Sequence, residues 1–98
     1  MNIEKKLEGD VLEMKVSGRL DTSTAPDLDN ELKSEIEGIT RLVMDFAELE
    51  YISSAGLRVL LSAQKIMNKQ GTMEVTGVNE TVMEIFEVTG FSDILTVS

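Results

Sequence analysis

The sequence predicts one α/β domain over residues 1–98, with a mixed, mostly parallel sheet and helices packed mainly on one face. Two observations predict this class. Stretches with a two-residue apolar period alternate along the chain with stretches of helical period. Strands that alternate with helices are joined by right-handed crossovers, which put every helix on the same face when consecutive strands are neighbours. The expected order of elements is β-β-α-β-α-β-α-β.

Composition limits the chemistry that the chain can perform. With 98 residues, 42% of them apolar, the chain is long enough for one modest core. It has no cysteine and no histidine, so it lacks a thiolate nucleophile, a disulfide, and the usual neutral base and metal ligand. We therefore expect no metal and no cofactor.

Charge and hydropathy bear on the partners and the location of the protein. The net charge of −9 argues against nucleic acid and against an anionic membrane surface as partners. No apolar run is long enough to span a bilayer, and the first residues lack the apolar segment of a secretory signal. These features lead us to expect a cytoplasmic protein.

The N-terminal stretch predicts a hairpin. Ile3, Lys5 and Leu7 alternate with Glu4 and Lys6, a two-residue period that is typical of a strand with one buried face. Residues 11–17 alternate in the same way. Glu8, Gly9 and Asp10 between them are typical turn residues. The pair predicts an antiparallel hairpin at an edge of the sheet.

A first helix follows the hairpin. Thr24 with Asp27 three residues later resembles a capping box, and Pro26 falls in the first turn, where its missing N–H costs little. Thr22 and Ser23 are further candidates for the N-cap. The apolar stripe and the end of this helix are defined by Ala25, Leu28, Leu32, Ile36 and Gly38.

The next strand contains an unbroken apolar run, Leu42, Val43 and Met44. Such a run suits a central parallel strand that is covered on both faces, and cover on one face remains an alternative.

The second half of the chain predicts the remaining elements. A second helix begins near residues 53–54, and a short strand covers residues 73–76. Asn79 caps a third helix, which Gly90 ends. Residues 94–97 predict a last short strand or, as the alternative, the loose end of the chain.

The junction between the central strand and the second helix carries two adjacent hydroxyls, Ser53 and Ser54. A helix start offers free backbone N–H groups and the positive end of the helix dipole, which together accept anions such as phosphate. Gly56 permits a close approach of another segment. Without the glycines and lysine of a P-loop, or a histidine to activate a serine, ordinary N-capping is the simpler interpretation of the spacing.

Two carboxylates supply an alternative, enzymatic hypothesis. Asp21 and Asp45 end strands that the predicted topology makes neighbours, so their side chains are expected on the same rim as Ser54. They would then serve a small nucleotide-binding or hydrolytic protein. Capping of a loop by Asp21 and closure of a strand by Asp45 is the simpler explanation.

Two segments resemble the recurrent motifs of STAS domains. The run from Val43 to Leu61, with its Ser-Ser-Ala-Gly-Leu core, resembles the family signature, and the segment Gly18-Arg-Leu-Asp21 resembles the family's other recurrent segment. The length and the order of elements agree over essentially the whole chain. The resemblance implies a STAS fold.

Within that family, a free-standing chain of this size resembles the bacterial anti-sigma factor antagonists, or anti-anti-sigma factors. The resemblance implies that the unphosphorylated protein binds an anti-sigma factor that is also a serine kinase, which releases a sigma factor. It further implies that phosphorylation of Ser54 ends this binding and that a serine phosphatase restores it. Many members carry Asp where this chain has Ser53, so Ser53 is the second candidate for the phosphate.

The protein is therefore expected to be an interaction module and not an enzyme. The alternative is a STAS module of another signalling or transport-linked complex that phosphorylation does not regulate. The partner-binding surface implied by the resemblance comprises Asp21, Thr22, Ser23, Tyr51, Ser53, Ser54, Ala55, Gly56, Leu57 and Arg58, although burial in the core is the simpler role for Leu57.

Overall fold

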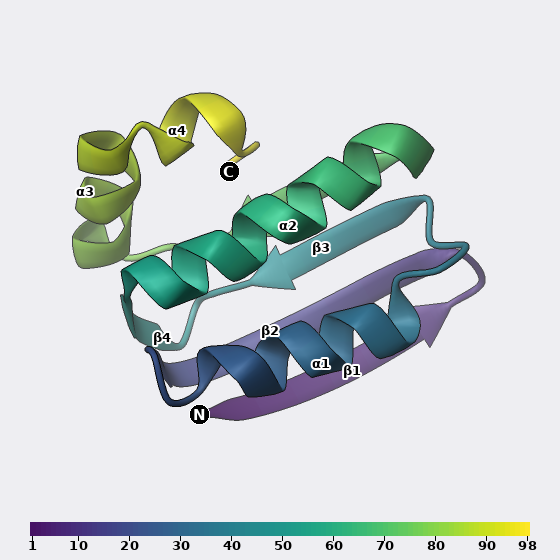
Figure 1. Ribbon diagram of the computed structural model, residues 1–98, viewed down its shortest axis with the longest axis horizontal. Helices are drawn as coiled ribbons and strands as arrows, with labels where there is room; N and C mark the ends of the chain where they lie inside the picture. Colours follow the sequence, from purple (N-terminus) through teal and green to yellow (C-terminus); the bar gives the residue numbers. More distant parts are fainter.

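The computed structural model describes residues 1–98 as a five-stranded mixed sheet with two long helices lying over one face (Figure 1). The strand order is β1-β2-β3-β5, and β4 pairs with β2 outside this path. The elements in chain order are β1 (Asn2–Glu8), β2 (Val11–Leu20), α1 (Ala25–Glu35), β3 (Arg41–Asp45), β4 (Leu49–Ile52), α2 (Ser54–Gln70), β5 (Thr72–Thr76), α3 (Glu80–Thr89) and α4 (Phe91–Ile94).

The predicted hairpin and parallel core of the sheet are confirmed. β1 pairs antiparallel with β2, while β3 runs parallel to both β2 and β5. β2 is longer than predicted, because it continues to Leu20 and pairs there with β4, from Gly18↔Leu49 to Leu20↔Ile52. The prediction lacks β4, a strand of only four residues. β4 pairs with residues 18–20 of β2, and the predicted strand ends before these residues.

The sheet is covered on one face, not on both. On β3, Leu42 and Met44 are fully buried beneath the helices, whereas Val43 between them is half-buried on the other face. Charged neighbours share that open face, where Arg41 on β3 bridges Glu74 on β5 with N–O separation 3.4 Å. The continuous apolar run therefore does not indicate a second layer. Of the two alternatives for this strand, cover on both faces is wrong and cover on one face is confirmed, as the predicted fold class requires, because the right-handed crossovers put the helices on one side.

The cap of the third helix is confirmed and that of the first is not. Asn79 accepts a hydrogen bond from the backbone N–H of Val82 at 2.8 Å, and Gly90 ends the helix in the left-handed region with φ 81°. Thr24 occupies the N-cap position of α1, but its side chain makes no capping bond, so the predicted capping box does not form. Its hydroxyl instead bonds backbone groups of the preceding loop.

The last element differs from the prediction. Residues 94–97 form no strand: α4 ends at Ile94, and a single bridge joins Val97 to Val75 of β5. The predicted strand is therefore wrong. Leu95 is buried next to a short helix that begins directly after Gly90.

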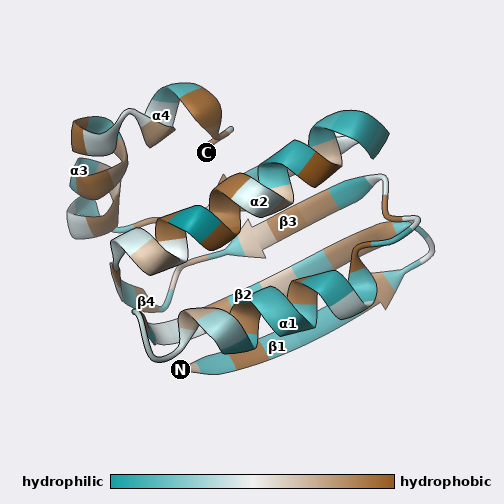
Figure 2. Cartoon of the chain, in the orientation of Figure 1, coloured by the Kyte–Doolittle hydropathy of each residue, from teal (hydrophilic) through white to brown (hydrophobic).

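The strands β2 and β3, which lie beneath α1 and α2, are largely coloured as hydrophobic, whereas β1 is mainly hydrophilic along its length (Figure 2). Ile3 is half-buried and Leu7 exposes 52% of its surface, so the expected buried face of β1 is incomplete. None of the helices combines the length and apolarity needed to cross a membrane.

Substitution of valine by threonine on the two faces tests the one-sided cover. Val43→Thr is expected to change the free energy of unfolding by less than about 0.5 kcal/mol, because the new hydroxyl faces water. Val75→Thr, at a fully buried position on the neighbouring strand, should cost about 1–3 kcal/mol, because the hydroxyl is buried. Urea denaturation measures both free energies of unfolding. An equal loss of stability in the two variants would contradict the conclusion that the Val43 face of the sheet is uncovered.

Candidate functional site

The carboxyl ends of β2 and β4 bring the two predicted segments together. Leu20 and Ile52 are register partners in parallel strands, and the backbone N–H of Ser53 donates to the carbonyl of Leu20 at 2.8 Å. The loop that follows β2 therefore lies beside the first turn of α2. The structure therefore places Asp21 and Ser53, which are 32 positions apart in the sequence, at the same end of the sheet.

The loop after β2 is organised around the carboxylate of Asp21. Its Oδ1 accepts hydrogen bonds from the Ser23 hydroxyl at 2.8 Å, the Ser23 N–H at 3.0 Å and the Thr24 N–H at 3.2 Å. Thr24 adds the opposite contact, since its hydroxyl accepts from the Asp21 N–H at 2.8 Å. These bonds confirm the interpretation of Asp21 as the residue that caps the loop.

The same contacts stabilise the charged form of Asp21. The Ser23 hydroxyl and then the Thr24 and Ser23 N–H groups hold the pKa of Asp21 below its ordinary value, against an opposing effect of burial. Asp21 is therefore ionised at neutral pH and acts as a fixed acceptor rather than as a proton donor.

The two serines of the junction have different environments. Ser53 is the half-buried N-cap of α2, and its Oγ accepts from the Gly56 N–H at 3.4 Å. Ser54 is the first residue of the helix, and its side chain is exposed. The hydroxyl of Ser54 has no hydrogen-bond partner in the chain, so it is the one that is free to react or to contact a partner.

Gly56 and Leu57 have packing roles. A Cβ atom on Gly56 would lie 2.7 Å from Leu20 Cγ and 2.8 Å from Ile52 Cγ1, which is closer than carbon atoms pack. Glycine here lets the first turn of α2 sit directly on the ends of β2 and β4. Leu57 is 5% exposed and belongs to the core. Gly56 has no side chain and that of Leu57 is buried, so neither residue offers a side chain to a partner.

The remaining predicted residues lie at the surface. The exposed ones are Thr22, Ser23, Ser54 and Arg58, and the half-buried ones are Asp21, Tyr51, Ser53 and Ala55. We call the exposed set the Ser54 surface.

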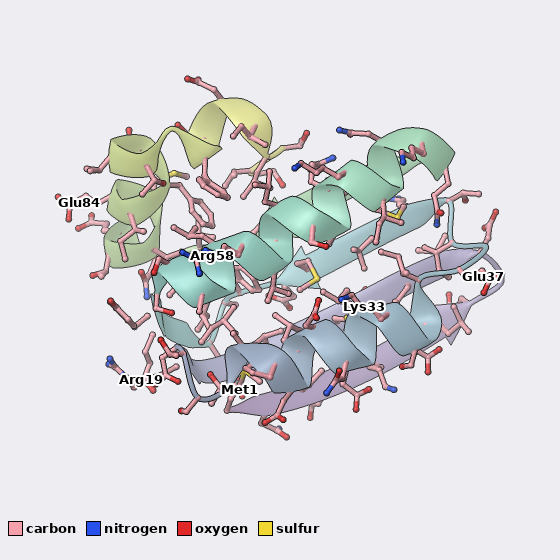
Figure 3. All side chains as sticks on the ribbon, viewed as in Figure 1. Met1, Arg19, Lys33, Glu37, Arg58 and Glu84 are labelled. Carbon is pink, nitrogen blue, oxygen red and sulfur yellow. The ribbon has the colours of Figure 1, made fainter.

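Arg19 is a neighbour of this surface that the sequence reasoning missed. It is the register partner of Tyr51 on β4, and its guanidinium carbon lies 4.5 Å from the centre of the Tyr51 ring. Arg19 and Arg58 occupy the same end of the molecule (Figure 3), and neither forms an ion pair. The short run Leu-Glu-Tyr-Ile is the one sequence feature that could have indicated β4, and with it the pairing of Arg19 with Tyr51.

Asp45 lies away from the site, contrary to expectation. It is the register partner of Lys15, which lies five positions, or about 17 Å of strand, before Leu20 at the end of β2. Its carboxylate accepts from the Ala47 N–H at 2.9 Å, which confirms that it closes its own strand. The enzymatic hypothesis requires Asp21 and Asp45 to lie close together, and the structure places them apart. No group of acidic residues is placed to hold a metal ion.

Comparison with known sequences identifies relatives over the whole chain. A family model described as the STAS domain matches residues 2–98. The chain is 38% identical over 85 residues to BtrV of Bordetella bronchiseptica, which is described as an anti-sigma factor antagonist, covering 85% of this chain and 73% of that protein. It is 31% identical to an anti-sigma-B factor antagonist of Staphylococcus epidermidis, covering 100% of this chain and 93% of that protein.

Solved structures share the fold at low identity. The anti-sigma factor antagonist SpoIIAA in its unphosphorylated form matches with a TM-score of 0.78 at 14% identity, covering 99% of this chain and 87% of that chain. Bacillus SpoIIAA in the phosphorylated form matches with a TM-score of 0.77 at 14% identity, covering 99% of this chain and 91% of that chain. The predicted fold class is confirmed.

The Asp21 network predicts a pH dependence of stability. A carboxyl group whose pKa is lower in the folded state stabilises the fold above its unfolded pKa, near 4, and this contribution is lost as the pH falls through the folded pKa. Asp21→Asn removes the charge, so the variant should be less stable at pH 7 by a margin that shrinks below about pH 4.

Urea denaturation at a series of pH values measures this margin. Asp93→Asn is the control, since its carboxylate accepts no hydrogen bond in the chain. A margin for Asp21→Asn that stays constant from neutral to acid pH would contradict the charge-based role.

Proposed function

The chain belongs to the STAS domain family, and we propose that it is an anti-sigma factor antagonist whose binding is switched off by phosphorylation of Ser54. In its unphosphorylated form it binds an anti-sigma factor that is also a serine kinase, and so frees a sigma factor. A serine phosphatase reverses the modification. In this proposal the chain is a substrate and a binding partner, not an enzyme. Its relatives named as anti-sigma factor antagonists support this assignment.

The observation that carries the proposal is the exposure of Ser54 at the first position of α2. A kinase requires a hydroxyl that it can reach and that no internal bond occupies. Ser54 meets both conditions, whereas Ser53 is half-buried and caps the helix. The geometry therefore favours Ser54 over the second candidate.

The first turn of α2 is suited to carry a phosphate without rearrangement. The backbone N–H groups of Ser54 and Ala55 have no acceptor within the chain, because they precede the first helical bond, from Leu57 N–H to the Ser53 carbonyl at 3.0 Å. These groups and the helix dipole favour a negative charge at this position. Arg58, four residues along the same helix, is free to pair with it.

Likeness to both forms of SpoIIAA supports a switch that leaves the fold intact. The unphosphorylated and phosphorylated forms of that protein match this chain with TM-scores of 0.78 and 0.77. We infer that the modification acts at the surface, through added charge and bulk, and not by remodelling the domain.

The electrostatic setting explains how one phosphate releases a partner. The chain carries a net charge of −9, and Asp21 stays ionised beside the Ser54 surface. A kinase that binds here must bring complementary, positive groups or tolerate the existing charge. Phosphate adds about −1.5 to −2 charges at the centre of that contact. A loss of about 1.4 kcal/mol already lowers the affinity tenfold.

The site of modification is the first test. The protein is incubated with ATP and an anti-sigma factor kinase from the same organism, and the phosphate is located by mass spectrometry. We expect one phosphate, on Ser54, which Ser54→Ala abolishes and Ser53→Ala retains, because only Ser54 is exposed and free of internal bonds. Phosphate on Ser53 would reassign the acceptor, and phosphate on neither serine would refute the switch.

Binding of the kinase domain tests the mechanism of release. Ser54→Ala should bind it as the unmodified protein does, whereas Ser54→Asp should bind at least about tenfold more weakly, because it places a charge at the contact. Isothermal titration calorimetry gives both constants. Ser54→Asn, similar in size to the aspartate but neutral, is the control, and equal weakening by Asn and Asp would show that bulk rather than charge drives release.

A further inference from the structure

β1 is an open edge of the sheet. It is the terminal strand of the order β1-β2-β3-β5, it pairs only with β2, and no bulge interrupts its seven residues from Asn2 to Glu8. It also contains no proline. A long, regular edge of this kind exposes a row of unpaired backbone N–H and carbonyl groups, which will pair with another strand unless the side chains prevent it.

We propose that β1 pairs antiparallel with β1 of a second copy of this chain, so that two sheets join into one across a two-fold axis. The axis passes between the two copies of Lys5. Residues whose numbers add up to ten then face each other across the junction, with Ile3 opposite Leu7 and Glu4 opposite Lys6. Symmetry repeats each pair, since residue i of one copy faces residue j of the other and the reverse.

The side chains of β1 are complementary to themselves in this register. Glu4 and Lys6 lie on the open face of the sheet and form two cross-strand ion pairs. Ile3 and Leu7 lie on the helix face, as their partners Val16 and Leu12 on β2 do, and form two apolar pairs. The 52% exposure of Leu7 is then accounted for, because the second copy covers it.

Neighbouring registers are poorer. Opposite residues must share a face, so the next possible centres are Glu4 and Lys6. Centring on Glu4 sets the apolar Ile3 against Lys5, and centring on Lys6 sets Glu4 against Glu8. Charged side chains on an edge strand disfavour pairing with unrelated strands. On β1 the order of these charges is such that opposite charges face each other when two copies of β1 pair.

The two copies of Lys5 face each other on the axis, and each is neutralised by carboxylates of its own chain. The ammonium group of Lys5 lies 2.6 Å from a carboxylate oxygen of Glu31 and 3.2 Å from one of Glu35, both on α1. Two copies of Lys5 therefore approach with their counter-ions in place.

The proposed dimer leaves the Ser54 surface free. β1 pairs with β2 only as far as Ser17, and β4, which leads into Ser54, pairs with β2 beyond that point. Self-association is therefore independent of the proposed partner switch, and the two are tested separately.

Sedimentation equilibrium of the full chain, up to about 1 mM to reveal weak association, tests the dimer. The unmodified chain should form a dimer that depends on concentration. Glu4→Lys and Lys6→Glu should each weaken it at least about tenfold, because each turns two attractive pairs into repulsive ones. The variant with both changes should recover the dimer, and an equimolar mixture of the two single variants should form a heterodimer, since its facing charges are again opposite.

Charge-matched changes elsewhere are the controls. Glu84→Lys on α3 and Lys65→Glu on α2 alter net charge equally at exposed positions (Glu84 is labelled in Figure 3) and should leave the dimer unchanged. Glu4 and Lys6 are exposed, so circular dichroism should show that all variants are folded. A monomer at every concentration, or a mixture of the single variants that stays dissociated, would overturn the proposal.

Discussion

The structure depends on one strand, β2, which pairs with two different parallel partners in succession. Residues up to Lys15 pair with β3, and residues from Gly18 pair with β4 across a register shift. The second pairing ends in the backbone bond between Ser53 and Leu20, 2.8 Å long. Because the loop after β2 and the helix after β4 both leave from this end, the two motifs become one surface. A shorter β2 would leave Ser54 without its neighbouring loop.

Close packing and hydrogen bonds support this surface from below. Gly56 lets the first turn of α2 rest on Leu20 and Ile52 where a methyl group would collide with both. Beside it, the carboxylate of Asp21 orders the adjoining loop through bonds to Ser23 and Thr24. A hydroxyl held on such a support presents a constant shape to a partner. A phosphate added there changes the charge of the surface far more than its backbone.

One-sided cover of the sheet decides which other surfaces are available. Arg41 and Glu74 form an ion pair beside Val43 on the face of the sheet that no helix covers. Covering these charges would remove them from water, so this face is a poor place for another protein to bind. β1 differs because its backbone edge is unpaired and its charges match those of a second copy. The two proposed contacts of this acidic chain therefore use separate surfaces, the Ser54 surface at one end of the sheet and the β1 edge along one side.

The sequence by itself determined the elements that local chemistry specifies, and the tertiary structure decided what distant residues do together. Period-two alternation identified the hairpin, helical stripes identified the helices, and Asn79 and Gly90 marked the ends of α3, because these signals act within a few residues. The STAS resemblance implied Ser54 as the acceptor. Only the fold shows that Ser54 is exposed whereas Ser53 caps the helix. The fold alone also shows that Asp45 lies far from Asp21 and that Arg19 stacks on Tyr51. Those relations depend on strand register, and the four residues of β4 carried too weak a local pattern to reveal it.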